Sequence, residues 1–275
     1  MGANRLCFSR LFVFLCMLGT LFITSCSPAT ATSTPTSTIT VTPTLTPTTT
    51  PTTTPTLTPT LPPISLTPSD QLPDMPNKPQ PKETTFNGCP PEGKGGDSIQ
   101  NLLKNRIDEG NYVPVNFDAI MSLTWPKTAQ QKDRKTWSPE DTATIAKHEG
   151  IPVIAEGYLA GAKESGSEST NCDKTSRDMV DWHVWFVKNS GEGRNISIVI
   201  EPTPRSRANH QWTLAKLKPV IDNQERVRIS GWVFFDPEHP DQLTLTRGTL
   251  WEIHPVMQIE VFQNNQWVPL DNIGQ

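Results

Sequence analysis

Charged residues are absent from a long N-terminal stretch of this 275-residue sequence, between Arg10 and Asp70. Tryptophan is absent from an even longer stretch, because all eight tryptophans lie at or after Trp125. The chain therefore divides into an uncharged N-terminal part and a folded part, and only about the last 190 residues are expected to bury a core. That length suits one ordinary domain with an N-terminal extension and excludes a large multidomain enzyme.

Most of the motifs that would identify a reaction are also missing. The folded part has no glycine-rich phosphate-binding loop, no Gly-x-Ser-x-Gly nucleophile elbow and no internal repeat. The zinc-site spacings His-Glu-x-x-His and Cys-x-x-Cys do not occur. A basic surplus is missing as well: the formal net charge is -4, which argues against a general nucleic-acid binder.

The N-terminus has the pattern of an export signal. Two arginines precede an apolar run, residues 11–23, whose 13 residues fall short of the roughly 20 that a transmembrane helix needs. The letters ITSC that end at Cys26 resemble the bacterial lipobox, so we interpret residues 1–25 as a lipoprotein signal peptide and Cys26 as the lipidated residue. This predicts a lipid anchor in a bacterial cell membrane, with the chain facing away from the cytoplasm. Ordinary signal cleavage near Ala29 is the alternative.

Residues 26–85 are rich in threonine, proline and serine. Such a composition buries too little apolar surface to offset the entropy of ordering, so the segment is predicted to be disordered. Frequent prolines favour polyproline II, and at about 3.1 Å per residue the contour length reaches roughly 150 to 180 Å. We therefore expect a semi-rigid stalk, either O-glycosylated or a passive tether.

Two cysteines remain once the signal peptide and the lipidated residue are set aside. They are Cys89 and Cys172, an even pair in a compartment expected to be oxidising. We expect a disulfide between them, which would stabilise the fold by about 4 kcal/mol in the chain-entropy model. Two free thiols are the alternative.

The folded part is expected to begin with a small helical extension, residues 86–150. Asp97 or Ser98 can cap a helix whose apolar face would consist of residues at helical spacing: Ile99, Leu102, Leu103 and Ile107. Ser138, followed by a proline and two acidic residues, predicts the start of another helix, and Gly150 ends that segment.

From residue 151 onward the hydrophobic period changes from helical to alternating. The segments expected to form strands are residues 151–163, 181–188, 195–201, 226–235 and 256–263, with a short last strand at 266–270. A helix is expected between the third and fourth strands, and Gly157 is expected to mark a bulge in the first. This order predicts a mainly β fold, a five-stranded OB-fold-like barrel over residues 151–275, with a small open α+β sheet as the alternative.

Several motifs in this part resemble a bacterial family of uncharacterised proteins, some of them exported. They are ESTNC at residues 168–172, DWH at 181–183, the run from Val227 through Gly231-Trp232 to His239-Pro240, and RGTLWEIHP at 247–255. The resemblance covers about residues 89–270 and implies one contiguous domain. It implies no activity and no catalytic residue.

In an OB barrel, ligands usually meet the face of the second and third strands, between the loops that follow the first and fourth strands. Side chains that could converge at these places are His183, Trp185, Glu201, Asp236, His239 and Arg247, and all of them except Asp236 are candidate ligand-binding residues. Trp185 offers a stacking plane, and Arg247 offers a fork for phosphate or carboxylate. The acidic balance and the predicted location argue against nucleic acid and favour a sugar ligand.

A metal site is an alternative use of the same region. His183, Glu201 and His254 are donor types that suit zinc or another divalent metal. Their scattered spacing is equally compatible with buried, hydrogen-bonded side chains and no cofactor.

The main functional hypothesis needs no cofactor and no catalysis. It is a binding or interaction module whose partners are the membrane, through the lipid, and a cell-wall polysaccharide or an envelope protein. A metal-dependent hydrolase, for example one acting on phosphodiesters, and a structural envelope scaffold are the alternatives.

Overall fold

The computed structural model describes residues 67–130 and 133–274. The predicted signal peptide, the lipidated Cys26 and the predicted stalk as far as residue 66 lie outside this part of the chain. Within the described residues, no helix combines the length and the apolar character needed to cross a membrane.

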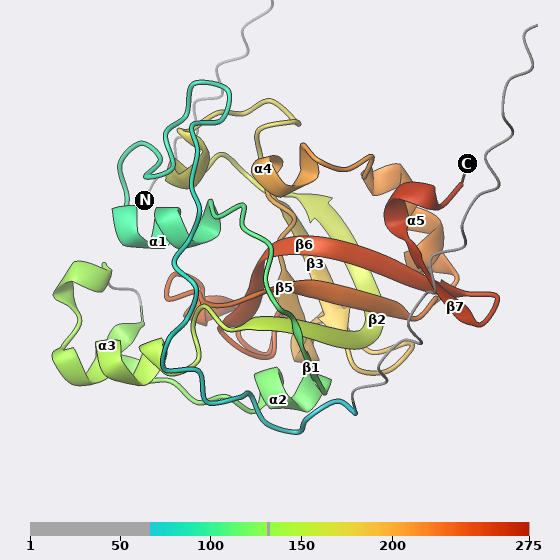
Figure 1. Cartoon of the computed structure of the whole chain (residues 1–275), viewed down its shortest axis with the longest axis horizontal. Coiled ribbons are helices and arrows are strands. Elements are labelled where there is room, and N and C mark those ends of the chain that lie inside the picture. Colours follow the sequence, from blue (N-terminus) through green and yellow to red (C-terminus); the bar gives the residue numbers. More distant parts are fainter. Residues whose placement is uncertain (1–66, 131–132, 275) are drawn as a thin grey trace, which may run out of the picture. The chain divides into compact units, whose positions relative to one another are not determined.

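Five strands form a closed barrel (Figure 1). They are β2 (Pro152–Glu164), β3 (Trp182–Val187), β4 (Ile198–Ile200), β5 (Val227–Phe235) and β6 (Trp251–Gln263). β2 pairs with both β3 and β5, which closes the ring in the order β2-β3-β4-β6-β5. β4 and β6 are parallel, and the other neighbours are antiparallel. The predicted OB-fold-like barrel is confirmed, and the open sheet is excluded.

Two further strands extend the barrel. β1 (Val113–Val115) pairs with β2 in parallel, and β7 (Gln266–Pro269) pairs with β6 in antiparallel orientation. β7 agrees with the short last strand expected from the sequence. The sequence does not predict β1, because three residues are too few to show an alternating pattern.

The structure corrects the start of the last barrel strand. β6 begins at Trp251, whereas the sequence predicts a strand only from residue 256. Residues 251–257 are all buried and include a proline. Trp251 to His254 do alternate apolar and polar residues, but Pro255 interrupts this alternation, and a proline usually argues against the interior of a strand.

The bulge expected at Gly157 is also placed differently. The register of β2 against β3 shifts between Leu159 and Gly161. Gly157 serves packing instead, because a Cβ atom there would lie 2.4 Å from the carbonyl oxygen of Val187.

Apolar side chains fill the barrel interior. Fully buried examples from the five strands are Val153, Val184, Ile198, Ile229 and Ile253. Between β4 and β5 the chain forms α4 (Pro204–Arg207) and α5 (Leu214–Asp222), and Leu217 and Val220 of α5 join the core. The helix predicted between the third and fourth barrel strands is confirmed.

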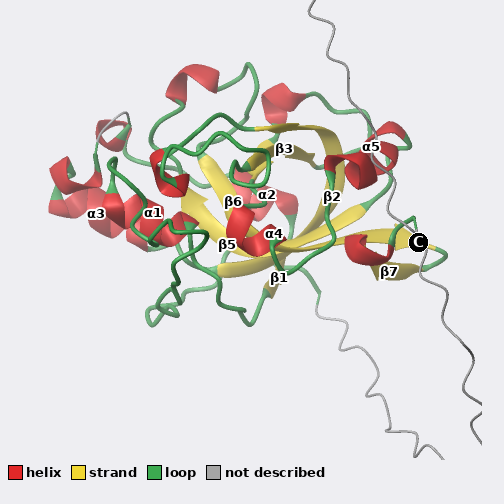
Figure 2. Ribbon diagram, turned by 90° about the horizontal axis from the view of Figure 1, so that it is seen from above, coloured by secondary structure: helices red, strands yellow, loops and turns green. Residues whose placement is uncertain are grey.

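Among the described residues, three helices come before the barrel: α1 (Ser98–Lys104), α2 (Phe117–Met121) and α3 (Pro139–Ala146). Short 3-10 turns lie at Lys127–Ala129, Arg134–Thr136, Ser169–Asn171, Arg194–Ile196, Pro240–Gln242 and Leu270–Asn272. Figures 1 and 2 both place α1 and α3 at one end of the barrel and α5 at the other. Ser138 caps α3, as the sequence predicts.

The helix α1 begins as predicted but buries the opposite face. The carboxylate of Asp97 caps it by accepting hydrogen bonds from the backbone N–H groups of Ile99 and Gln100. Gln100, Asn101 and Lys104 are buried, whereas Ile99 is 49% exposed. The apolar spacing predicts the wrong buried face because the surface that α1 covers is itself polar and charged.

The packed part of the chain begins before residue 86. Ser69 exchanges backbone hydrogen bonds with Pro114 and Asn116, on either side of the end of β1. Leu72 and Met75 pack against the hydrophobic core. The predicted end of the stalk at residue 85 is therefore too late, because an edge strand and a few apolar side chains give this proline-rich segment partners.

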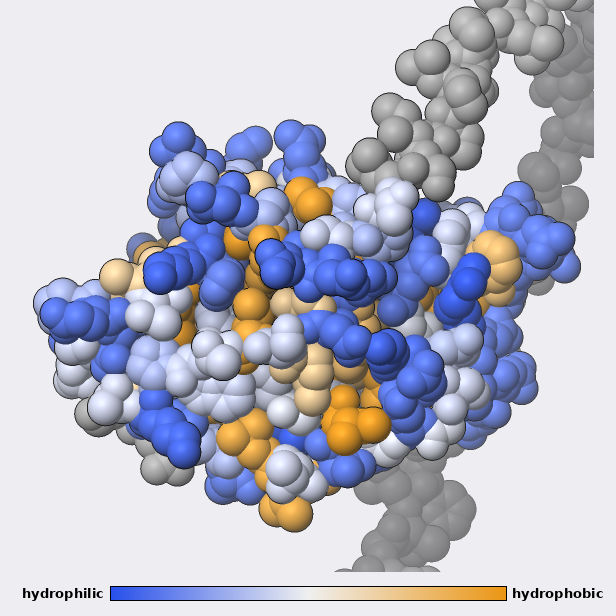
Figure 3. All heavy atoms as spheres, turned by 90° about the horizontal axis from the view of Figure 1, so that it is seen from below, coloured by the Kyte–Doolittle hydropathy of each residue, from blue (hydrophilic) through white to orange (hydrophobic). Residues whose placement is uncertain are grey.

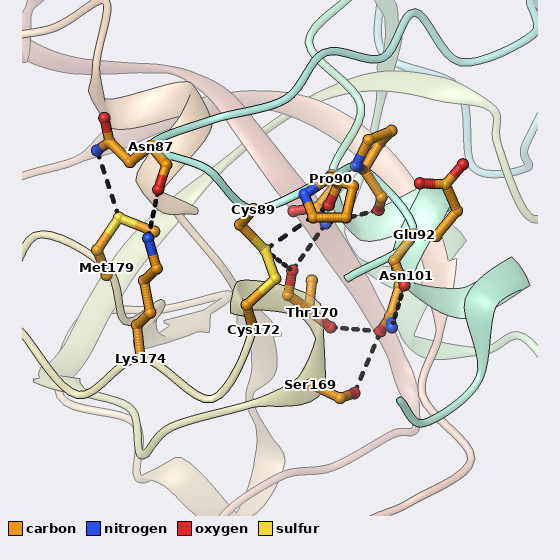
Figure 4. Close-up of a disulfide and its surroundings, with 12 residues drawn as sticks. Asn87, Cys89, Pro90, Glu92, Asn101, Ser169, Thr170, Cys172, Lys174 and Met179 are labelled. Atoms are coloured by element: carbon orange, nitrogen blue, oxygen red, sulfur yellow. Dashed lines mark hydrogen bonds between the residues drawn. A yellow bond between two sulfur atoms is a disulfide. The ribbon is translucent and has the colours of Figure 1, made fainter. Parts of the chain in front are cut away.

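The predicted disulfide between Cys89 and Cys172 is present (Figure 4). It joins the N-terminal segment to the loop between β2 and β3 across a sequence separation of 83. Beside it, the amide of Asn101 donates to the carbonyl of Glu92 and accepts from the hydroxyl of Thr170. The bridge and this amide together hold α1 against the loop.

Figure 3 shows one face of the domain, on which hydrophilic residues cover most of the surface. Hydrophobic residues are visible there in several small groups. Groups of this size are ordinary on a folded surface, so this face gives no reason to place a docking site on it.

Candidate functional site

One outer face of the barrel carries histidine and carboxylate side chains. Ile253 of β6 lies in the core, so its neighbours Glu252 and His254 point to the other side of the strand. The same alternation directs His183 of β3 and Glu201, which follows β4, to this outer face. Three of these four side chains are nevertheless buried, so the face is covered.

The cover is the polar face of α1 together with the loop between β2 and β3. Nζ of Lys104 in α1 donates to Oε2 of Glu168 in that loop at 3.3 Å and lies 5.7 Å from the ring centroid of Phe234. The amide of Gln100 donates to Glu238 at 2.9 Å. The N-terminal extension thus contacts the region in which OB folds commonly bind ligands.

Glu201 connects two histidines through its two carboxylate oxygens. Its Oε1 lies 2.9 Å from Nε2 of His183, and its Oε2 lies 3.4 Å from Nδ1 of His254. The same nitrogen of His254 lies 3.4 Å from Oε2 of Glu252, and the other, Nε2, lies 3.9 Å from Oδ2 of Asp181. Three carboxylates therefore surround the buried ring of His254.

Arg247 and Asp236 continue this network toward solvent. Nη1 of Arg247 donates to Asp236 at 2.8 Å and to Glu252 at 2.9 Å, and Nδ1 of His239 lies 2.6 Å from Asp236. The rings of His183 and His239 lie 6.5 Å apart between centroids, and both are partly exposed. We refer to the whole set as the histidine–carboxylate cluster: Lys104, Glu168, Asp181, His183, Glu201, Asp236, His239, Arg247, Glu252 and His254.

Burial and neighbouring charges shift the pKa values in the cluster. Burial, with Glu168 adding to it, raises the pKa of Asp181 to about 7. The carboxylate of Glu201 raises the pKa of His183 to about 9 against the opposing effect of burial. Burial by itself would raise the pKa of Glu201, but His183 and His254 hold it below its usual range. Shifts of this kind occur both at functional sites and in structural ion networks.

The residues that the sequence singles out occupy three different settings. His183 and His239 reach solvent at the edge of the cluster. Glu201, His254 and Arg247 are brought together as well, but they are buried, and the Arg247 guanidinium is engaged by two carboxylates. Trp185, which is 5% exposed, lies beneath Arg194, whose guanidinium is 3.8 Å from the ring centroid.

Sequence reasoning missed four members of the cluster: Lys104, Glu168, Asp181 and Glu252. Glu252 carries the one signal that could have revealed it, because a charged residue inside the run Leu250–Ile253 needs a partner if that run is buried. Lys104 carries no such signal, since a lysine on the polar face of a helix is usually solvated.

Two groups of three residues place ligand atoms within 4.8 Å of one another. One consists of Glu168, His183 and Glu201 at the edge of the cluster, and the other consists of Asp181, Glu201 and His254 in its interior. The predicted metal trio is divided between these groups, because its two histidines contact different oxygens of Glu201.

A cleft of about 530 Å³ lies beside the loop between β2 and β3. Its apolar lining comes from several elements: Phe86, Trp182, Pro204, Trp212 and Leu214. Its charged lining consists of Glu164, Arg177, Asp178 and Arg207. The volume falls within the range of small-ligand sites, which combine an apolar lining with a few polar groups.

No protein-family model matches this chain, and no curated protein matches its sequence. The cluster and the cleft are therefore judged on their geometry alone.

Proposed function

We propose that this protein is a lipid-anchored envelope protein that binds a sugar polymer in the cleft beside the β2–β3 loop. The observation that carries the proposal is the cleft itself, which places two tryptophans and four charged side chains around one cavity. Aromatic rings pack against the apolar faces of sugar rings, and charged side chains hydrogen-bond to sugar hydroxyls.

The polar groups of the cleft differ in how firmly they are held. Arg207 is fixed, because its guanidinium lies 4.4 Å from the ring centroid of Trp182 and donates to the carbonyl of Pro202 at 2.9 Å. Arg177 is 84% exposed and pairs only with Glu164, at 2.7 Å, among the ion pairs of the described residues. A ligand can therefore recruit Arg177 without disrupting the fold.

The N-terminal sequence supports display of this cleft away from the membrane. A lipid on Cys26 would hold the chain at the bilayer, and the threonine- and proline-rich stalk would extend the barrel toward wall polymers. The anchor is tested by growing cells with labelled palmitate and measuring its incorporation into the full chain. We expect the wild type to be labelled and Cys26→Ala to be unlabelled. Equal labelling of the variant would contradict the anchor.

The hydrolase and scaffold alternatives have less support from the geometry. A hydrolytic metal needs a coordination position that water and substrate can reach. The interior trio is buried, and in the edge trio Glu168 already accepts from Lys104 and Ser165. A scaffold has no need of a cleft with an aromatic lining.

Binding is tested with the full chain and soluble probes: peptidoglycan fragments and a panel of purified neutral and acidic polysaccharides. We expect Arg177→Ala combined with Asp178→Ala to weaken binding by about tenfold or more. Both side chains are exposed, so the fold is retained. Lys218→Ala, an exposed residue of α5 that does not line the cleft, is the matched control. A wild-type chain that binds none of the probes, or a double variant that binds as well as the wild type, overturns the proposal.

A further inference from the structure

In each of Asp181, Glu201 and His254, a neighbour holds one polar atom of the side chain and leaves a second polar atom without a hydrogen bond. One atom of each is held by a neighbour: Oδ1 of Asp181 accepts from Asn171 at 3.1 Å, and Oε1 of Glu201 lies 2.9 Å from His183. Nδ1 of His254 is likewise held, 3.4 Å from Glu252. A second atom of each is fully buried and has no hydrogen-bond partner among the described residues: Asp181 Oδ2, Glu201 Oε2 and His254 Nε2. Oε2 of Glu201 has one ion-pair contact, 3.4 Å from Nδ1 of His254.

This arrangement matches what metal ligands require. A ligating histidine donates one ring N–H to a carboxylate, which fixes the tautomer and leaves the other nitrogen as the donor atom, and ligating carboxylates are themselves hydrogen-bonded. When Nδ1 of His254 carries the proton and donates it to Glu252, Nε2 keeps its lone pair. This Nε2 atom lies 3.9 Å from Oδ2 of Asp181. Two ligand atoms of one tetrahedral zinc ion lie about 3.4 Å apart, so Nε2 and Oδ2 need to move only slightly closer together to bind one ion.

The charges in direct contact within the cluster are also out of balance. The cluster contains four buried carboxylates: Asp181, Glu201, Asp236 and Glu252. It contains only two buried Lys and Arg cations, Lys104 and Arg247. The nearby Arg205 and Arg207 donate to backbone carbonyls and form no ion pair with these carboxylates. His183 and His239 pair with Glu201 and Asp236 and meet part of this difference, and a divalent cation beside Asp181 would complete the compensation that buried charges need.

We propose that Asp181, Glu201 and His254 bind one divalent transition-metal ion of the zinc class. The imidazole favours zinc or a neighbouring transition metal over calcium and magnesium, and carboxylate oxygens also ligate zinc. The ion joins the end of the β2–β3 loop, the end of β4 and the strand β6. Its role is structural: it holds together the three segments beneath the partly exposed His183. This inference is independent of sugar binding, since none of the three ligands lines the cleft.

The test measures the metal content of the full chain, expressed with added zinc, by elemental mass spectrometry. We expect about one ion per chain, and thermal unfolding that moves to lower temperature with a chelator and returns when zinc is restored. Asp181→Asn and His254→Ala should lose the ion. Glu168→Gln and His239→Ala, which change the same cluster without touching the three ligands, should retain it.

Two outcomes overturn the proposal. The first is a wild-type chain without metal whose unfolding temperature responds neither to chelator nor to zinc. The second is loss of the ion in Glu168→Gln with retention in His254→Ala, which places the metal in the edge trio instead. Because the wild-type chelation experiment needs no substitution, misfolding of a variant does not remove the test. Polysaccharide binding is read separately, through the cleft variants.

Discussion

The barrel interior and the covered outer face lie one residue apart along β6, yet different interactions hold them. Ile253 packs among aliphatic and aromatic side chains, whereas Glu252 and His254 on either side of it are held by ion pairs and hydrogen bonds. The interior depends on shape and apolar area, and the outer face depends on charge compensation. Burial alone therefore does not identify the core side of a strand in this protein.

The outer face should tolerate substitution less than the interior does. Replacing Arg247 should give the largest loss of stability. Arg247→Leu keeps much of the apolar volume but leaves Asp236 and Glu252 buried without their shared cation. We expect the free energy of unfolding to fall by about 3 to 5 kcal/mol in a urea titration. The matched control is Arg177→Leu, which breaks an exposed pair and should cost less than about 1 kcal/mol. Equal losses in the two variants would show that the outer face behaves like ordinary surface.

The interior should respond to volume instead of charge. Ile253→Ala is expected to lower the free energy of unfolding by about 2 to 5 kcal/mol, because it leaves a cavity in the barrel. Ile253→Leu conserves volume and should cost less than about 1.5 kcal/mol. The same urea titration measures both. A leucine variant as unstable as the alanine variant would mean that β6 tolerates no repacking on its core side.

The interior was largely predictable because alternation reports it directly. The segments 181–188 and 226–235 begin with alternating apolar and polar residues, continue as apolar runs, and form β3 and β5. The start of β6 was missed because Pro255 interrupts the alternation of Trp251 to His254. Alternation identifies a strand, but a proline inside the run hides how far the strand extends, and alternation does not show whether the polar face is buried.

The outer face was predictable only in part. His183, Glu201, His239, Arg247 and His254 attract attention as residue types, and the fold brings them into one network. Their partner Lys104 comes from α1, whose apolar spacing predicts the opposite buried face. Which face of a short helix is buried depends on the surface it meets, and that surface is built from residues distant in sequence. The cleft was missed for the same reason, because Phe86 and Trp212 meet only after folding.

The smallest expected effect concerns α1, the helix that separates the outer face from solvent. Asp97 caps it and also accepts from the backbone N–H of Arg134 at 2.7 Å, with Asp133 beside it. Burial would raise the pKa of Asp97, but these backbone hydrogen bonds lower it below its usual value. The carboxylate therefore stabilises the fold above its unfolded pKa of about 4, and this contribution is lost as the pH falls through the folded pKa.

Asp97→Asn should remove that acid dependence at a cost of about 1 kcal/mol at neutral pH. Hydrogen exchange, corrected for intrinsic rates, should show α1 amides of the wild type losing protection below about pH 4 while β5 and β6 amides keep theirs. In the variant the protection of α1 should be lower throughout and flat with pH. An equal acid-induced loss in the variant would assign the opening to other carboxylates. Exchange that rises together in α1 and the barrel would mean that the cover and the interior unfold as one unit, which would remove the distinction between the two faces.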